Sequence, residues 1–175
     1  KKTSKKLQML TRKRNNKIKD YLHKSTRIVV NYCVENQISK VVIGYNKEWK
    51  QDINLGKKTN QNFVQIPFLQ GINQLQYKLK LEGIECIIHE ESYTSKCSAL
   101  DNEEVKKHES YLGKRVKRGL FKTSEGILVN ADVNGAINIL RKGTGDTELT
   151  RIQTASIGLV LNPMKINSSL TNLKF

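Results

Sequence analysis

The sequence has few cysteines, few prolines and no long hydrophobic run. Its three cysteines, Cys33, Cys86 and Cys97, are irregularly spaced, and two lie inside apolar runs, where a reduced cysteine behaves as a small hydrophobic side chain. We therefore expect no disulfide framework and a reducing compartment. No apolar stretch approaches the roughly 20 residues that span a membrane, and Lys1–Lys6 is followed by further charge rather than by a signal-peptide core. A soluble, cytoplasmic protein without a membrane partner is expected.

Acidic residues are scarce relative to basic ones. The chain holds 31 Lys and Arg against 16 Asp and Glu, which gives a formal net charge of +15. Such an excess favours a polyanionic partner such as nucleic acid. Composition alone leaves open a merely basic surface, as in a ribosome-associated protein. The length of 175 residues and the hydrophobic content of 37% suit one main core with an appendage.

The first half of the chain alternates helical and strand-like patterns. Lys5–Gln37 repeats apolar residues every three to four positions with Lys and Arg between them, which predicts a long amphipathic helix with a basic outer face. Lys40–Asn46 (KVVIGYN) and Ile84–His89 (IECIIH) are short, β-branched runs that read as strands. Phe68–Leu79 has the apolar stripe of a second helix, and the polar segment 47–65 before it predicts a loop.

The second half contains an insertion, a short helix and a tail. Ser92–Gly126 is Lys-rich and contains glycines, and Asn130–Lys142 (NADVNGAINILRK) has the periodicity of a helix. Residues 147–175 have a weak pattern and little core of their own. The order of elements predicts an α/β sheet domain over residues 1–146, in which parallel strands are joined by crossover helices.

Carboxylates occur at two element ends, where the active sites of open α/β sheets collect. Glu90 and Glu91 follow the second predicted strand, and Asp132 begins the last helix. Phosphodiester cleavage with two divalent ions needs several converging carboxylates, and these positions could supply two ligands. The alternatives are that Asp132, or Asn130 before it, is a helix N-cap, and that the two glutamates are a solvated strand end.

Two stretches resemble a known family. Asn130–Leu140 (NADVNGAINIL) resembles the D-x-N-A-A-x-N-I segment that closes the RuvC-like nuclease domain of TnpB, the OrfB-type protein of transposons, and of its type V CRISPR relatives. Glu91–Ser98 (ESYTSKCS) resembles the P-S-S-K-x-C-S run that begins the family's zinc-ribbon insertion. The resemblance covers most of residues 5–142. It implies a partial RNase H-like (RuvC) fold with a degenerate ribbon-like insertion in residues 92–126.

The resemblance also implies roles for the last helix. Asp132 would be the last metal-binding aspartate of the family, and Asn134 and Asn138 would be the asparagines of the motif. The intact family protein is a transposon-borne DNA endonuclease in prokaryotes. A guide RNA selects the target DNA and a RuvC-like site containing Mg²⁺ cuts it. We accordingly expect DNA and guide RNA as partners, Mg²⁺ at Glu91 and Asp132, and a location at the nucleoid.

The catalytic residues depart from the family pattern at two points. The family's second catalytic glutamate lies on the first strand, in a pattern like I-x-I-E-D-L, but Gly44 stands in that place here. A subgroup of the family relocates this glutamate to the neighbouring strand, just before S-Y-T-S-K, where Glu91 stands. Glu90 is the second choice, because neighbouring strand residues point to opposite faces. The first catalytic aspartate, in a D-x-G strand, has no counterpart in Lys1–Val41, so we expect the opening strands to be missing.

The insertion departs from the pattern as well. The usual ribbon has two C-x-x-C pairs, whereas only Cys97 is present, with Leu100 in its partner's place and no cysteine in Gly113–Gly126. One cysteine cannot hold a structural zinc, so we expect none. Apolar contacts are expected to shape the insertion instead, at Tyr111, Leu120 and Phe121.

Basic residues of the insertion, and Trp49 in the polar segment 47–65, are the candidates for nucleic-acid binding. Trp49, between Lys47 and Lys50, could stack on a base or be a buried aromatic plug. The insertion could also be an ordinary charged loop. The runner-up function is a catalytically dead, nucleic-acid-binding remnant of a transposon protein. The cations expected to face phosphate are Lys96, Lys114, Arg115, Lys117, Arg118 and Lys122.

Overall fold

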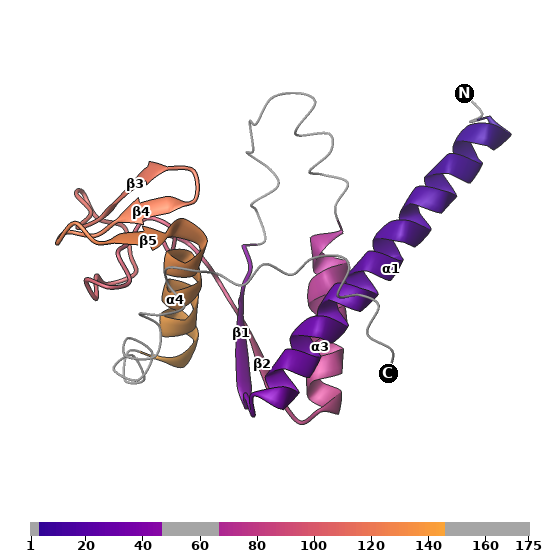
Figure 1. Ribbon diagram of the computed structural model, residues 1–175, viewed down its shortest axis with the longest axis horizontal. Helices are drawn as coiled ribbons and strands as arrows, with labels where there is room; N and C mark the ends of the chain where they lie inside the picture. Colours follow the sequence, from indigo (N-terminus) through magenta and orange to yellow (C-terminus); the bar gives the residue numbers. More distant parts are fainter. Residues whose placement is uncertain (1–3, 47–66, 146–175) are drawn as a thin grey trace. The chain divides into compact units, whose positions relative to one another are not determined.

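The computed structural model describes residues 4–46 and 67–145, which fall into two compact units (Figure 1). The first unit contains residues 4–41 and 67–86 of this range, and the second contains residues 42–46 and 87–145. The predicted loop 47–65 with Trp49, and the predicted tail 147–175, lie outside the described residues. Within the described ranges, no helix combines the length and the apolar character that a membrane span requires.

The first unit is built on two helices. α1, Lys5–Glu35, begins after Ser4, whose hydroxyl accepts a hydrogen bond from the backbone N–H of Leu7 at 3.3 Å. α3, Phe68–Leu81, packs against α1 and ends before Gly83, which has a φ of 72°. Both helices were predicted within two residues at each end. The Lys and Arg side chains of the N-terminal half of α1 are exposed, and so are its apolar residues Leu7, Met9 and Leu10.

The core of the first unit is small and partly polar. Val30, Cys33, Leu79 and Ile84 form its apolar cluster. The buried Lys78 ammonium donates to the carbonyl oxygen of His23 at 2.7 Å and to the Thr26 hydroxyl at 2.8 Å. Burial lowers the pKa of Lys78, and the positive charge of Arg27 lowers it further. The α1–α3 contact is therefore fixed by hydrogen bonds as well as by packing.

The two predicted strands form a parallel pair. β1, Lys40–Gly44, and β2, Glu85–His89, make a two-stranded sheet. The N–H of Glu85 donates to the carbonyl oxygen of Ser39, and the N–H of Tyr45 donates to that of His89, both at 2.9 Å. Residue numbers increase in the same direction along both strands, so the strands are parallel, and α3 lies in the connection between them. This agrees with the predicted crossover arrangement.

The second unit contains a small antiparallel sheet that the sequence pattern did not predict. Its strands are β3 (Lys114–Lys117), β4 (Leu120–Lys122) and β5 (Leu128–Asn130), in that spatial order (Figure 1). α4, Ala131–Thr144, follows β5 directly and ends at Gly145, which has a φ of 83°. Three- and four-residue strands are too short for an alternating pattern to be recognised.

The core of the second unit lies between the insertion sheet and α4. It contains Ala99, Phe121, Val129, Ala131 and Ile137. Of the apolar contacts predicted for the insertion, Phe121 is confirmed as a core residue, whereas Tyr111 and Leu120 are only half-buried. Because so few apolar side chains are buried, polar interactions must help to hold this unit together.

Candidate functional site

The N-terminus of α4 is capped by Asn130. Its side-chain oxygen accepts hydrogen bonds from the N–H groups of Asp132, at 2.9 Å, and Val133, at 3.2 Å. The carboxylate of Asp132 is therefore not needed as a cap. It is exposed in the first turn, with no hydrogen bond or ion pair to any other described residue. Of the two capping alternatives that the sequence left open, the structure supports Asn130, and Asp132 remains available for a ligand.

Glu91 lies beside Gly44, the strand position to which the resemblance assigns the family glutamate. A Cβ atom at Gly44 would lie 2.7 Å from Oε2 of Glu91 and 2.6 Å from Cδ1 of Ile139, closer than carbon atoms normally approach such neighbours. Glu91 follows β2 and is half-buried. Its carboxylate thus occupies the space of a residue-44 side chain, and only glycine leaves that space open without a shift of Glu91 or Ile139.

The helix face that carries Asp132 is the face that contacts β1. Ile139 meets Gly44, and a side chain at Gly143 would collide with Val42. Asp132 precedes Ile139 by seven residues, which is about 20° short of two full turns, so both lie on the same face. The rise over seven residues is about 10 Å. Asp132 and Glu91 are therefore on the same side of α4, with Asp132 toward its N-terminus.

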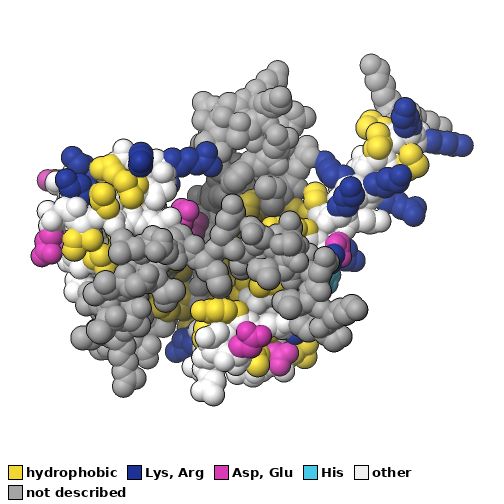
Figure 2. All heavy atoms as spheres, in the orientation of Figure 1, with side chains coloured by type: hydrophobic (Ala, Val, Ile, Leu, Met, Phe, Trp, Pro, Cys, Tyr) yellow, Lys and Arg dark blue, Asp and Glu magenta, His cyan; other side chains and the backbone are white. Residues whose placement is uncertain are grey.

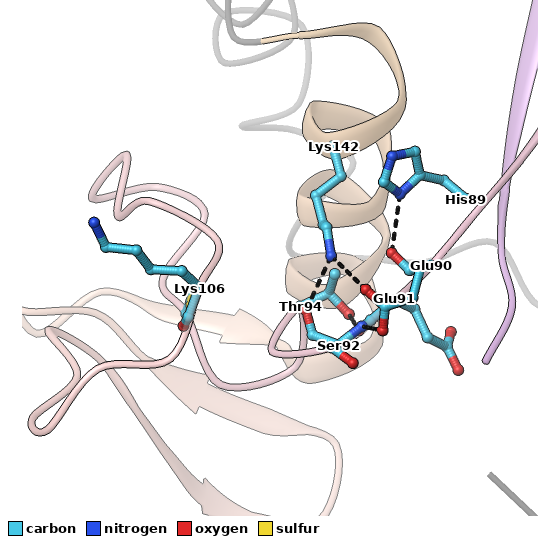
Figure 3. A network of polar contacts seen from close by, with 8 residues as sticks. His89, Glu90, Glu91, Ser92, Thr94, Lys106 and Lys142 are labelled. Atoms are coloured by element: carbon cyan, nitrogen blue, oxygen red, sulfur yellow. Dashed lines mark hydrogen bonds and ion pairs between the residues drawn. The ribbon is translucent and has the colours of Figure 1, made fainter. Parts of the chain in front are cut away.

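Glu90 has different surroundings from Glu91. Its Oε2 forms an ion pair with Nζ of Lys142 at 2.8 Å, and its Oε1 accepts from the N–H of Ser92 at 2.6 Å. The hydrogen bond from Lys142, followed by that from Ser92, lowers the pKa of Glu90 to about 2. In Figure 3 the Glu90 carboxylate meets Lys142, whereas that of Glu91 points away from it, toward β1. The two glutamates are thus neither equivalent nor a simple solvated strand end.

The motif asparagines are buried on the opposite face of α4 and bind the start of the insertion. Asn134 accepts from the N–H of Ala99 and donates to the carbonyl oxygen of Cys97, both at 2.9 Å. Asn138 donates to the carbonyl oxygens of Thr94, at 2.9 Å, and Cys97, at 2.8 Å. Asn134 is about 200° around the helix from Asp132. These asparagines fix the chain after Glu91 rather than reaching Asp132.

Sequence analysis missed two buried charged residues that hold the insertion. The Glu103 carboxylate accepts from the N–H of Ser98 at 2.6 Å and from that of Leu112 at 3.0 Å. The Arg141 guanidinium donates to the carbonyl oxygens of Glu103, at 2.8 Å, and Asn102, at 3.2 Å. They join two parts of the insertion to each other and to α4. The available signal was an acidic residue within a basic insertion, and an arginine three positions before the last residue of the helix.

Cys97 is buried, and its thiol faces a backbone carbonyl group. Burial, as the largest effect, raises the pKa of this thiol, and its Sγ lies 3.5 Å from the carbonyl oxygen of Lys106. Across residues 4–46 and 67–145, no three His, Cys, Asp or Glu side chains gather in a group that could hold a metal ion. Glu91 and Asp132 could therefore supply at most part of a ligand set.

The sheet brings three of the predicted cations together. In the register of the sheet Lys114 pairs with Lys122, Arg115 with Phe121, and Lys117 with Leu120, with a bulge between Arg115 and Lys117. Cross-strand partners share a face, and residues 120 and 122 share a face, so the three lysines lie together. Leu120 and Leu128 are on this face as well. We call Lys114, Lys117, Lys122, Leu120 and Leu128 the lysine face.

The other predicted cations lie elsewhere. Arg115 is on the face of Phe121, Arg118 is in the turn after β3, and Lys96 approaches the ring of Tyr111 to 5.9 Å. Figure 2 shows Lys and Arg side chains around hydrophobic ones over the part of the molecule that carries β3.

Comparison with known proteins gives two family matches. Residues 1–50 match the OrfB_IS605 family, described as a probable transposase, and residues 68–139 match the Cas12f1-like TNB domain. A solved structure, the cryo-EM structure of a Cas12f1–sgRNA–target DNA complex, is similar with a TM-score of 0.61 and 22% identity. The chain is a TnpB-like relative of the type V effectors. No curated protein matches it.

The matches cover both halves of the candidate site in this TnpB-like chain. The transposase match includes β1 with Gly44, and the TNB-domain match includes Glu91, the insertion and α4 through Ile139. The structural similarity extends over 81% of this chain but only 37% of the Cas12f1 chain. At this identity it establishes a shared mixed α/β fold. The resemblance deduced from NADVNGAINIL and ESYTSKCS is thus confirmed.

Proposed function

We propose that this chain forms the C-terminal, RuvC-like part of a TnpB-like, RNA-guided DNA endonuclease, with Glu91 and Asp132 as metal-binding carboxylates. The observation that carries the proposal is the position of Glu91 Oε2, 2.7 Å from where a side chain at Gly44 would begin. A carboxylate from the neighbouring strand end thereby reaches the place where the family's glutamate is attached. The carboxylate ligand would then come from position 91 instead of position 44.

The chemistry of these two side chains fits a hard cation such as Mg²⁺. Both are carboxylates, Asp132 is exposed, and neither has a hydrogen bond or ion pair to another described side chain. Mg²⁺ binds one or two protein carboxylates and completes its shell with water and substrate phosphate. When bound, it would neutralise charge on the phosphate and lower the pKa of a water nucleophile. The third carboxylate of the family, in a D-x-G strand, is not found in residues 1–41.

The lysine face is the proposed nucleic-acid contact. Three ammonium groups beside two exposed or half-buried leucines suit a chain of phosphates with unstacked bases. The similar Cas12f1 structure contains sgRNA and target DNA, so we propose target DNA and guide RNA as the partners here. Lys96, Arg115 and Arg118 are proposed as secondary phosphate contacts, since they lie away from the lysine face.

The alternative function is a nucleic-acid-binding remnant without catalysis. It is favoured by one observation, namely that the described residues contain no cluster of three metal-binding side chains. In this case the lysine face would still bind nucleic acid, and binding would fall steeply with salt.

A nicking assay separates the two functions. The chain joined to the D-x-G opening strands of a homologue is incubated with single-stranded DNA and Mg²⁺. We expect cleavage by the joined protein, and its loss in Glu91→Gln and in Asp132→Asn. Glu109→Gln, an exposed glutamate of the insertion, serves as the matched control.

Cleavage by Glu91→Gln at the parent rate would show that Glu91 is not a ligand. Failure of every joined form to cleave, with salt-sensitive DNA binding retained, would favour the remnant.

A further inference from the structure

The chain on both sides of Glu91 is attached to one side chain of α4. Nζ of Lys142 donates to Oε2 of Glu90 at 2.8 Å and to the carbonyl oxygen of Ser92 at 3.3 Å. The N–H of Ser92 also donates to Oε1 of Glu90 at 2.6 Å, which closes a ring around Glu91 (Figure 3). We call this arrangement of Glu90, Ser92 and Lys142 the lysine clamp. It restricts the backbone torsions of Glu91 from both sides.

A second attachment holds the same segment one helical turn away. The carbonyl oxygen of Glu91 accepts from the Thr94 hydroxyl at 2.8 Å, and the carbonyl oxygen of Thr94 accepts from Asn138 at 2.9 Å. Asn138 and Lys142 are four residues apart on α4, and Asp132 lies at its start. One rigid helix therefore carries Asp132 and also fixes the backbone from which Glu91 extends.

The Glu91 side chain depends on this backbone for its direction. Among the described residues no hydrogen bond or ion pair holds its carboxylate, which lies against Gly44 and Ile139 through van der Waals contact alone. A carboxylate placed only by its backbone and by two apolar surfaces loses its position when the backbone is released. A precise ligand geometry requires such support.

The charge of Lys142 is compatible with a neighbouring cation because Glu90 neutralises it. A free ammonium near Glu91 would repel a divalent ion. Paired with Glu90 at 2.8 Å, with only 18% of its side chain exposed, Lys142 is instead held in a neutral pair that faces away from the Glu91 carboxylate.

We propose that Glu90 and Lys142 are positioning residues, which hold the backbone of Glu91 on α4 and thereby direct its carboxylate to β1, so that it binds a divalent cation together with Asp132. This inference rests on the proposed function, since it presupposes a cation at Glu91 and Asp132. In this arrangement Glu90 is not an alternative metal ligand but part of the lysine clamp that holds Glu91.

The test uses Mn²⁺ as the probe and the isotope-labelled full chain. Paramagnetic broadening of amide signals near Glu91 and Asp132 is followed as Mn²⁺ is added, which gives an apparent Kd even for weak binding. For Lys142→Met we expect a Kd about 10-fold higher than for the parent, the lower end of the effect of losing a supporting residue. If Lys142 acted only through its charge, its removal would instead lower the Kd, so the sign of the change decides.

Four further variants, one of them a control, complete the test. Glu90→Gln should raise the Kd to a similar extent, and the double variant should bind no more weakly than either single variant, because both changes break the same clamp. Lys142→Arg, which can still donate to Glu90 and Ser92, should recover most of the affinity. Lys106→Met is the matched control, because it removes a lysine from an exposed ion pair with Glu104 in the same unit. Its Kd should equal that of the parent.

The two proposals fail in different ways. If broadening in Glu91→Gln and Asp132→Asn equals that of the parent, the metal site itself is refuted. If those variants lose it while folded Lys142→Met and Glu90→Gln bind Mn²⁺ as tightly as the parent or more tightly, the site stands and the clamp is overturned. Amide signals of α4 show whether each variant is folded. If Lys142→Met unfolds, the comparison of Lys142→Arg with Glu90→Gln decides whether the clamp supports Mn²⁺ binding.

Discussion

A side chain at Gly44 would meet the carboxylate of Glu91 and the end of the Ile139 side chain. A Cβ atom attached to Gly44 would lie 2.7 Å from Glu91 Oε2 and 2.6 Å from Ile139 Cδ1, so both side-chain ends would have to move to admit a methyl group. A side chain at position 44 and the Glu91 carboxylate in its present position therefore exclude each other.

Gly44→Ala should displace the Glu91 carboxylate and thereby weaken Mn²⁺ binding. The added methyl group meets two flexible side-chain ends that can move aside, so the cost in the free energy of unfolding should be about 1 kcal/mol or less. Amide broadening by Mn²⁺ and urea unfolding measure the two effects. Gly135→Ala is the matched control, since a Cβ there meets nothing within 4 Å and alanine favours the helix. Unchanged Mn²⁺ binding by folded Gly44→Ala would contradict the close approach.

The same relationship predicts a rescue. Glu91→Ala alone should lose Mn²⁺ binding, because it removes the carboxylate that lies beside Gly44. The double variant Gly44→Glu with Glu91→Ala returns the carboxylate to the strand and should recover binding that Glu91→Ala alone lacks. Amide broadening by Mn²⁺ is measured for the parent, the single variant and the double variant. Absence of recovery in a folded double variant would mean that the two positions are not interchangeable as ligand sources.

Glu103 should stabilise the insertion in place of a metal. Glu103→Ala leaves the N–H groups of Ser98 and Leu112 without their acceptor in a buried place, which should cost about 2 kcal/mol or more. Glu104→Ala, next in sequence but exposed, should leave the free energy of unfolding unchanged. Urea unfolding is measured with and without added zinc. If added zinc restores the free energy of unfolding of Glu103→Ala, or if the purified parent contains stoichiometric zinc, the prediction of a zinc-free insertion is refuted.

The ion pair between Glu90 and Lys142 predicts a specific pH dependence. The pKa of Glu90 is lowered from its ordinary value of 4.5 to about 2, first by the hydrogen bond from Lys142. A lowered folded-state pKa means that the pair stabilises the fold above about pH 4.5 and that this contribution is lost as the pH falls toward 2. In Lys142→Met the pKa of Glu90 should rise toward 4.5, as measured by carboxyl-carbon NMR. The stability difference from the parent should shrink over the same pH range. An unchanged pKa would mean that Lys142 does not hold Glu90 in solution.

Sequence patterns predicted the larger elements because these repeat their signal. α1 and α3 carry several turns of apolar periodicity, and their ends were found within two residues. The strands β3 to β5 have three or four residues each and include a bulge, so no alternation could mark them. Their lysines were predicted individually, but a shared face depends on the register. Since the bulge brings Lys114 and Lys117 to the same side, sequence spacing alone would have separated them.

The candidate site was only partly predictable, for a different reason. Asp132 and Glu91 were deduced from a family resemblance, whereas their environment depends on contacts across the chain. Gly44 and Glu91 are far apart in sequence, and the buried pairing of Glu103 with two N–H groups has no periodic signature. Asn134 and Asn138 were identified as motif residues, but the partners they bind became visible only in the structure.

The lysine face makes a prediction about salt dependence that separates it from the other cations. Lys114→Gln, Lys117→Gln and Lys122→Gln should each weaken single-stranded DNA binding. Each should also reduce the slope of log affinity against log salt concentration by about 0.7, the value for one phosphate of a single strand that is no longer neutralised. Arg115→Gln, on the face of Phe121, should change the slope less, although it removes the same charge from the same strand. Fluorescence anisotropy at several salt concentrations measures the slopes. Equal slopes for Arg115→Gln and the three lysine variants would mean that binding follows net charge, and that the face created by the bulge has no special role.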